Sequence, residues 1–283
     1  MLLAVDIGNS SITVGAFREG EEPIFTMGFS ALEPRSADEY ANTLRMAMKV
    51  KGIDPSEIQD GAISSVVPPL TPLMASALYS LCNRRPLELG AGVRTGISIR
   101  TDSPAEVGAD IIANAVAACC EQGAIIVDFG TATTVFAVNQ KKELLGGAIL
   151  PGIRSSAESL RSTTAQLPAV PLQVGKEPIG RNTADCIANG VLLGQAFAVD
   201  GFVRRYRAFL GGDPKLLATG DLAPLILPHS ALSFEQDPYL TLKGLRKIYE
   251  KTRKIKSKRL YRLFDQYYEL RCTCQKGQGV SIG

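Results

Sequence analysis

Apolar runs of strand length alternate with longer segments of helical periodicity along the first 240 residues. Residues 2–29 read as a strand meander with a turn at 18–23, whereas apolar residues in 36–51 recur at helical spacing and stop at Gly52. The same criteria predict strands over 62–67, 87–100, 143–152 and 216–221, and helices over 72–82, 109–122, 152–162 and 182–209. This order predicts an α/β architecture repeated twice, with a boundary near residue 120.

One short sequence occurs twice, as LAVDIGNSS at 3–11 and as IIVDFGTATT at 125–134. Each copy is an apolar run, an aspartate, an apolar residue, a glycine, and then small polar residues. Because the β-rich segments 12–17 and 135–138 follow, each glycine turn is predicted to join two strands of a hairpin.

A hairpin restricts the nucleotide chemistry that these turns can perform. Walker and dinucleotide motifs lead from a strand into a helix, and neither GxxxxGK[ST] nor GxGxxG occurs at the two repeats. A hairpin instead offers turn N–H groups and hydroxyls to phosphates, and its aspartate to a metal ion. An ordinary turn is the simpler interpretation of either copy alone. The recurrence favours two hairpins that grip one polyphosphate from both sides.

Composition is that of a globular protein: the 283 residues are 45% hydrophobic and 21% charged. No uninterrupted apolar run approaches the roughly 18 residues of a membrane span, and the chain starts with a predicted core strand. We therefore expect a cytoplasmic protein without a membrane partner. The six cysteines show no CxxC spacing, which argues against a zinc site or a disulfide framework.

The net charge of +3 conceals an asymmetry, because residues 243–283 contain 12 Lys or Arg against 3 Asp or Glu. A solvated tail is the simpler interpretation of this basic end. Binding of an acidic partner or of nucleic acid is the alternative, and nucleic acid is not expected.

The ordered motifs make the chain similar to type III pantothenate kinases, also described as the Bvg accessory factor family. This resemblance covers roughly residues 1–250. It is carried by DIGNS (6–10), PAEVGAD (104–110), NAVAA (114–118), DFGTATT (128–134), GAILPG (147–152), TAQLP (164–168) and IGRNT (179–183).

The resemblance implies membership of the acetate and sugar kinase, Hsc70 and actin superfamily. It implies two ribonuclease-H-like domains, over 1–120 and 121–250, each a mixed five-stranded sheet flanked by helices, followed by a basic extension at 251–283. The implied activity is ATP-dependent phosphorylation of pantothenate to 4′-phosphopantothenate, the first step of coenzyme A biosynthesis, by a homodimer.

The family's roles carry over to matching positions. Asp6 is implied to organise Mg²⁺ with ATP, and Asp128 to bind a monovalent cation, K⁺ or NH₄⁺. ATP contacts are implied for Asp6, Ile7, Gly8, Asn9, Ser10, Ser11, Ile12, Thr13 and Thr131. Asp110 is implied to be the catalytic base. From spacing alone, Asp110 is simply a helix-capping residue.

The implied pantothenate site contains Thr101, Gly108, Ala109, Asp110, Ile111 and Thr183. Two of these positions depart from the family, which has tyrosine in place of Thr101 and arginine in place of Ile111. An aliphatic side chain cannot replace the charge-assisted hydrogen bond of a guanidinium. Compensation could come from Arg100, Arg154 or Arg181.

A further departure is Asp221, which stands where the family has the second glycine of a turn near adenosine. The departures leave two alternatives to pantothenate kinase activity. One is a nucleotide-binding regulatory paralogue with an altered or lost acceptor site. The other is a kinase for a different small hydroxylated acid.

Overall fold

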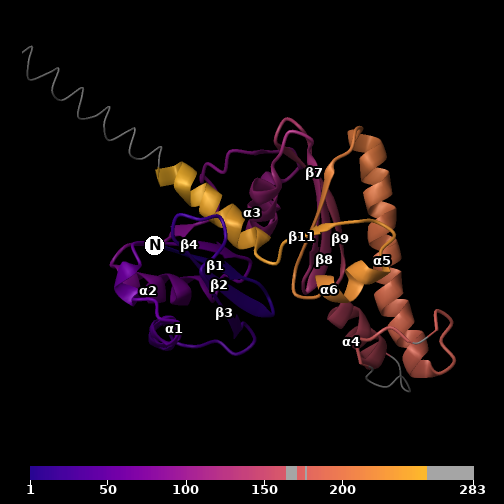
Figure 1. The fold of residues 1–283 in the computed structure, drawn as a ribbon, viewed down its shortest axis with the longest axis horizontal. Helices are drawn as coiled ribbons and strands as arrows, with labels where there is room; N and C mark the ends of the chain where they lie inside the picture. The colour runs from indigo at the N-terminus through magenta and orange to yellow at the C-terminus, as the bar shows by residue number, and fades with distance from the viewer. Residues whose placement is uncertain (164–170, 176, 254–283) are drawn as a thin grey trace, which may run out of the picture.

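The computed structural model describes residues 1–163, 171–175 and 177–253, which form two sheets with helices around them (Figure 1). The first part of the chain contains β1 (Leu2–Ile7), β2 (Ser11–Phe17), β3 (Phe25–Ser30), α1 (Ala37–Val50), β4 (Asp60–Ser65), α2 (Thr71–Cys82), β5 (Leu87–Glu88), β6 (Ser98–Ile99) and α3 (Ala109–Ala118). The second contains β7 (Ala124–Phe129), β8 (Ala132–Val138), β9 (Glu143–Pro151), α4 (Ile153–Thr163), α5 (Thr183–Leu210), β10 (Lys215–Thr219), α6 (Ala223–Ile226) and β11 (Glu235–Gln236). A last helix starts at residue 240, and its described part ends at 253.

The two sheets share one strand order. The first runs β3-β2-β1-β4-β5, and the second runs β11-β10-β7-β8-β9-β6, which contains the same arrangement read in reverse with β6 added at one edge. In each, the first strand pairs antiparallel with the second and parallel with a later strand. The predicted five-stranded mixed sheet is therefore present twice, and the second sheet gains a sixth strand from the connecting segment.

Helices cover both faces of the first sheet. α1 and α2 pack on one face through Tyr40, Leu44, Met74 and Leu78. Helix α1 begins with a capping box, in which Ser36 and Glu39 exchange side-chain and backbone hydrogen bonds. The opposite face is covered by α3 and by helix 240–253, whose apolar residues pack together.

Helix α3 lies between the two sheets. Its Ala113 and Val116 contact the first sheet's cluster, whereas Ala115 and Ala118 belong to a cluster with Ile126 of the second sheet. A helix that is apolar on nearly all sides is expected in this position, because neither side faces water.

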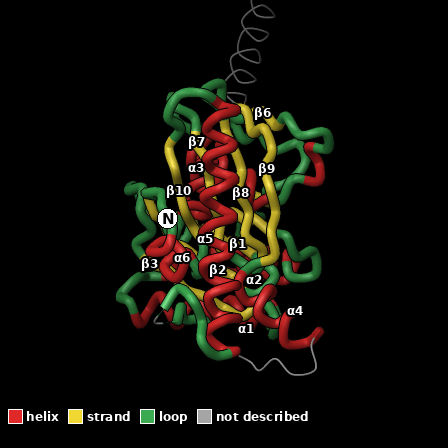
Figure 2. The backbone as a smooth tube through the Cα atoms, turned by 90° about the vertical axis from the view of Figure 1, so that its right-hand side faces the viewer, coloured by secondary structure: helices red, strands yellow, loops and turns green. Residues whose placement is uncertain are grey.

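Helix α5 covers the outer face of the second sheet and runs along its strands (Figure 2). By length and composition, the 28-residue α5 is the one described helix that could cross a membrane, with a mean hydropathy of 1.5 over an 18-residue window. In the fold, Leu192, Val199 and Val203 are buried against the second sheet. The apolar character of α5 thus belongs to a core helix.

Most predicted elements are present within a few residues of their predicted bounds. Two predictions were wrong in extent. Residues 87–100 are a loop with two-residue strands at its ends, because Gly90, Gly92 and Gly96 interrupt it. Helix α3 ends at Ala118 rather than at residue 122, since residues 119–123 form the turn into β7.

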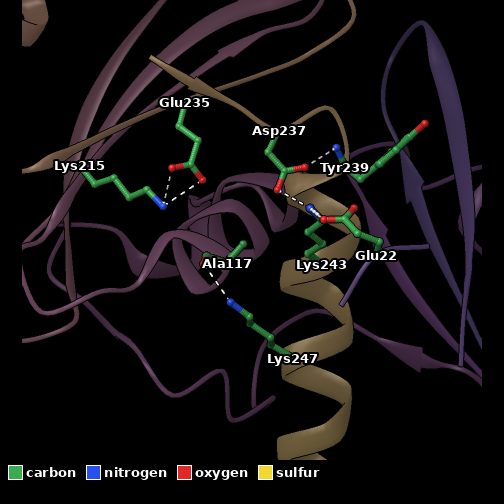
Figure 3. A network of polar contacts seen from close by, with 8 residues as sticks. All are labelled: Glu22, Ala117, Lys215, Glu235, Asp237, Tyr239, Lys243 and Lys247. Atoms are coloured by element: carbon green, nitrogen blue, oxygen red, sulfur yellow. Dashed lines mark hydrogen bonds and ion pairs between the residues drawn. The ribbon is translucent and has the colours of Figure 1, made fainter. Parts of the chain in front are cut away.

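The predicted boundary near residue 120 falls in the turn before β7, and two segments cross it. β6 pairs with β9 of the second sheet, while helix 240–253 returns to the first sheet. Lys243 of this helix connects the units by pairing with Asp237 at 2.8 Å and with Glu22 at 2.5 Å (Figure 3). Of the predicted extension at 251–283, residues 254–283 lie outside the described residues.

Candidate active site

The two repeated hairpins face one another across a cleft of about 370 Å³ between the units. Its lining includes Asp6, Asp110 and Asp128, so three carboxyl groups converge from two strands and one helix. The remaining lining residues are Gly8, Asn9, Ser10, Ser11, Thr13, Val66, Gly130, Thr131, Ala132, Thr134, Thr219, Gly220, Asp221, Pro238, Tyr239, Thr241 and Leu242.

Asp6 lies near the end of the central strand β1. The hydroxyl of Ser64, its register partner on β4, donates a 2.9 Å hydrogen bond to Asp6 Oδ1. Burial and the nearby charges of Asp110 and Asp128 raise the pKa of Asp6 from 3.8 to about 7, although the Ser64 bond opposes this. A buried carboxylate with acidic neighbours is electrostatically suited to bind a cation.

Asp128 occupies the equivalent place on β7, next to Thr219 of the neighbouring parallel strand. The amide of Asn114 donates a 3.0 Å hydrogen bond to Asp128 Oδ2. Burial and the charge of Asp110 raise the pKa of Asp128 to about 6, while the Asn114 bond lowers it and Asp221 adds a smaller increase.

Asp110 is the second residue of α3, where its Oδ1 accepts a 2.8 Å hydrogen bond from the N–H of Ile111. The residue before the helix is Gly108, which provides no side-chain cap. Burial raises the pKa of Asp110, and its backbone hydrogen bonds oppose that shift. Asp110 therefore makes a local helix-terminal bond and also lines the cleft with its carboxyl group.

The hairpin turns present hydroxyl groups to the space between the sheets. Ser10 Oγ and Thr131 Oγ1 are 2.9 Å apart and hydrogen-bonded across it. The carbonyl oxygen of Thr131 accepts hydrogen bonds from Ser155 Oγ and from the N–H of Gly152, at 3.0 Å and 3.2 Å. These bonds tie the second turn to the start of α4.

The donor set fits hard cations. Carboxylate oxygens are the ligands that Mg²⁺ and similar ions prefer. Burial, and after it the neighbouring acidic groups, raise the pKa values of Asp6 and Asp128, and a bound cation would stabilise their charged forms. Glycine also keeps space beside Asp128, because a Cβ at Gly220 would stand 2.7 Å from Asp128 Oδ1. Within the described residues, no cluster of three or more His, Cys, Asp or Glu forms a metal site by itself.

Nine of the site residues predicted from the sequence line this cleft: Asp6, Gly8, Asn9, Ser10, Ser11, Thr13, Asp110, Asp128 and Thr131. Ile7 and Ile12 do not, because their side chains are fully buried in the first core. They form the last register pair before the turn and so shape it through the backbone.

The residues predicted for the acceptor are less concentrated. Gly108 and Ala109 lead into α3 beside Asp110, whereas Ile111 packs into the apolar cluster between α3 and the second sheet. Thr101 Oγ1 is buried without a hydrogen-bond partner among the described residues. Thr183 begins α5 and is exposed outside the cleft.

Two of the three candidate compensating arginines have acidic partners. Arg100 pairs with Glu143 at 2.7 Å, and Arg154 pairs with Asp221 at 3.4 Å. Arg181 is exposed just before α5.

Sequence reasoning missed residues that line the cleft and residues that support its aspartates. Ser64 and Asn114 support the two aspartates, and Tyr239 and Thr241 enter the cleft from the chain's last described helix and the turn before it. Ser64 could have been noticed as a polar residue in an apolar strand. The residues near 240 carried no local signal, because only tertiary packing returns them to the cleft.

The duplicated sheet and facing hairpins define the class of protein. This arrangement is an α/β fold of two units with the same strand order, whose repeated hairpins line one acidic cleft. Two solved structures share the fold. A Campylobacter jejuni protein of the Baf family aligns over 88% of this chain and 98% of its own, with TM-score 0.57 and 18% identity. Component A of (R)-2-hydroxyglutaryl-CoA dehydratase from Acidaminococcus fermentans aligns over 88% and 96%, with TM-score 0.51 and 11% identity.

Sequence comparison identifies the family. Residues 2–205 match the type III pantothenate kinase family. The chain is 42% identical to a type III pantothenate kinase of Moorella thermoacetica over 89% of this chain and 99% of that protein. It is 43% identical to one of Anaeromyxobacter sp. over 89% and 100%. The chain therefore belongs to the type III pantothenate kinase family, ATP-dependent enzymes that phosphorylate pantothenate in coenzyme A biosynthesis. The predicted family, fold class and activity are confirmed.

Proposed function

We propose that Asp110 accepts the proton of the pantothenate hydroxyl as that oxygen receives the γ-phosphoryl group of ATP. The observation that carries this proposal is the convergence of Asp110 with Asp6 and Asp128 in one cleft. Phosphoryl transfer through a loose transition state depends on positioning, and the proton leaves the hydroxyl late. Burial makes the Asp110 carboxylate a better proton acceptor than an exposed aspartate, because it raises the pKa of this group.

Asp6 and Asp128 hold the cations in this proposal. Asp6 binds the Mg²⁺ that accompanies ATP, and Asp128 binds the monovalent cation, K⁺ or NH₄⁺. Bound cations neutralise phosphate charge in the transition state. The turn residues Asn9, Ser10 and Thr131 contact the phosphates, a role supported by their polar groups at the tips of the facing hairpins.

Pantothenate binds beside Asp110 in this proposal, near Gly108 and Ala109. Ile111 stands where the family pattern has arginine, and it packs into the apolar cluster between α3 and the second sheet, so this position supplies no guanidinium to the acceptor. Thr101 provides a buried hydroxyl that has no partner among the described residues. Thr183 joins the acceptor site from a dimer interface.

A homodimer is supported by the outer face of α5. Gly190, Gly194 and Gly201 are exposed there, and a Cβ at any of them would meet no described atom within 4 Å. Phe197, which is 64% exposed, projects from the same face. Small residues around one aromatic side chain permit close approach of a second helix. We place the enzyme in the cytoplasm, since the one long apolar helix among the described residues is part of the core.

The decisive experiment measures ADP release with ATP, Mg²⁺, K⁺ and pantothenate. Asp110→Asn is expected to lower kcat by about 10²- to 10⁴-fold while ATP binding measured by calorimetry is retained. Asp128→Asn is expected to remove the response to K⁺. Asp38→Asn, an exposed change in the first turn of α1, is the matched control and should change neither property. Full turnover by Asp110→Asn would contradict the proposed base.

A further inference from the structure

A buried chain of hydrogen bonds runs from Thr241, at the edge of the cleft, through Asn114 to Asp128. The hydroxyl of Thr241 donates a 2.8 Å hydrogen bond to Asn114 Oδ1. The amide of Asn114 then donates to Asp128 Oδ2 at 3.0 Å. Asn114 and Thr241 are only 3% and 9% exposed. The chain joins helix 240–253, α3 and β7, three elements that are distant in sequence.

The Asp128 carboxylate and the Thr241 hydroxyl together hold the Asn114 amide in one orientation. An asparagine side chain can present either its oxygen or its NH₂ group. Since Thr241 donates to the oxygen, the NH₂ group is directed at the carboxylate. The opposite orientation would place two acceptors against each other in a buried environment, which is unfavourable.

The other carboxylate oxygen faces the two glycine turns. A Cβ built at Gly220 would lie 2.7 Å from Asp128 Oδ1, and one built at Gly130 would lie 3.6 Å from it. Asp128 is therefore held through Oδ2 by Asn114, and Oδ1 remains next to the turns that line the cleft.

We propose that Asn114 and Thr241 are positioning residues, which orient Asp128 so that Oδ1 binds the monovalent cation. This inference rests on the proposed function of Asp128. Asn114 also follows Asp110 by four residues on α3, so one helix supports both the base and the cation carboxylate. Loss of the relay weakens cation binding without removing any residue that the proposed function assigns to ATP or pantothenate.

Thr241→Val is the main test, because it replaces the hydroxyl with a methyl group of similar size. Its K⁺ concentration for half-maximal activity is expected to rise several-fold, and that of Asn114→Leu by about tenfold. In both variants, saturating K⁺ should restore most of kcat. Thr241→Ser keeps the hydroxyl and should retain the original K⁺ response.

A second readout does not require turnover. The melting temperature with Mg²⁺ and ADP is measured against KCl, with tetramethylammonium chloride holding ionic strength constant. Thr241→Val should need a several-fold higher K⁺ concentration for the same rise. Ser230→Ala is the matched control, because it removes a hydroxyl bound at 2.5 Å to buried Asp200, outside the cleft. This control should lower stability and leave the K⁺ response unchanged.

Two negative results have different meanings. If Thr241→Val and Asn114→Leu melt earlier but keep the original K⁺ response in both assays, the relay is only structural and the inference is wrong. If Asp128→Asn itself keeps that response, the proposed cation role of Asp128 fails first.

Discussion

The hydroxyl oxygens of Ser10 and Thr131 lie 2.9 Å apart and join the two hairpin turns by a hydrogen bond. Each residue belongs to one copy of the repeated motif, and 121 positions separate them. The first hairpin pairs Asp6 with Thr13, and the second pairs Asp128 with Thr134. The contact therefore joins equivalent regions of two related units. A phosphate chain between the turns would replace this bond with bonds to phosphate oxygens.

Removing either hydroxyl should weaken ATP binding. In Ser10→Ala and in Thr131→Ala, the KM for ATP is expected to rise about tenfold, since each loses a hydrogen bond to a charged group. Steady-state kinetics at saturating pantothenate measures this effect. Thr131→Ser keeps a hydroxyl and should stay within about twofold of the parent. An unchanged KM for ATP in both alanine variants would show that the turns do not contact the nucleotide.

The acidic cluster makes ligand-free stability depend on pH. The pKa of Asp6 is raised to about 7 and that of Asp128 to about 6, so the folded protein binds more protons than the unfolded chain between about pH 4 and 7. This stabilising contribution is fully present below pH 4 and is lost as the pH rises through 6 to 7.

Asp6→Asn removes one of these charges and can still accept the Ser64 hydrogen bond. Its melting temperature without ATP or divalent ions should exceed that of the parent at pH 8, and this advantage should disappear near pH 4. Asp54→Asn should change the melting temperature in the opposite direction at pH 8, because the hydrogen bond from the Ser56 N–H lowers the pKa of exposed Asp54. Calorimetric melting across this pH range measures both variants. A stabilisation of Asp6→Asn that did not vary with pH would contradict the electrostatic explanation.

The sequence was sufficient to predict the hairpins, because each combines an apolar strand, a turn glycine and a second β-rich strand within 15 residues. It also placed Asp6, Asp110 and Asp128 in one site through the family resemblance. Local patterns could not reveal that Thr241 supports Asn114, since 127 residues separate them. Nor could periodicity predict that Ile111 joins an apolar cluster, because α3 is apolar on both of its packed sides.

Gly220 is predicted to be essential for the nucleotide side of the cleft. Its φ is +93°, and a Cβ there would stand 2.6 Å from the carbonyl carbon and oxygen of Phe129. Gly220→Ala is therefore expected to lower the free energy of unfolding by about 1–3 kcal/mol and to raise the KM for ATP.

Gly212→Ala is the control that separates backbone strain at a positive φ from the close contact with Phe129. Gly212 also has a positive φ, +69°, but the nearest atom to its Cβ position is 3.9 Å away. This control should lose stability through backbone strain alone and keep the KM for ATP. Chemical denaturation and kinetics are measured for both variants. If Gly220→Ala and Gly212→Ala have the same KM for ATP, the close contact with Phe129 does not affect the cleft.

The exposed face of α5 predicts a monomeric variant. Phe197→Asp places a charge among Gly190, Gly194 and Gly201, where burial against a second helix would be unfavourable. If the parent is the proposed homodimer, light scattering after gel filtration should show half its mass for the variant. The melting temperature of the isolated subunit should change little, because Phe197 is 64% exposed. If Thr183 at the start of this helix completes the acceptor site in the dimer, the KM for pantothenate should rise more than that for ATP.

Val50→Asp, at an 80% exposed position ending α1, is the matched control and should keep the mass of the parent protein. A Phe197→Asp protein with the parent's mass would show that this face is not the dimer interface.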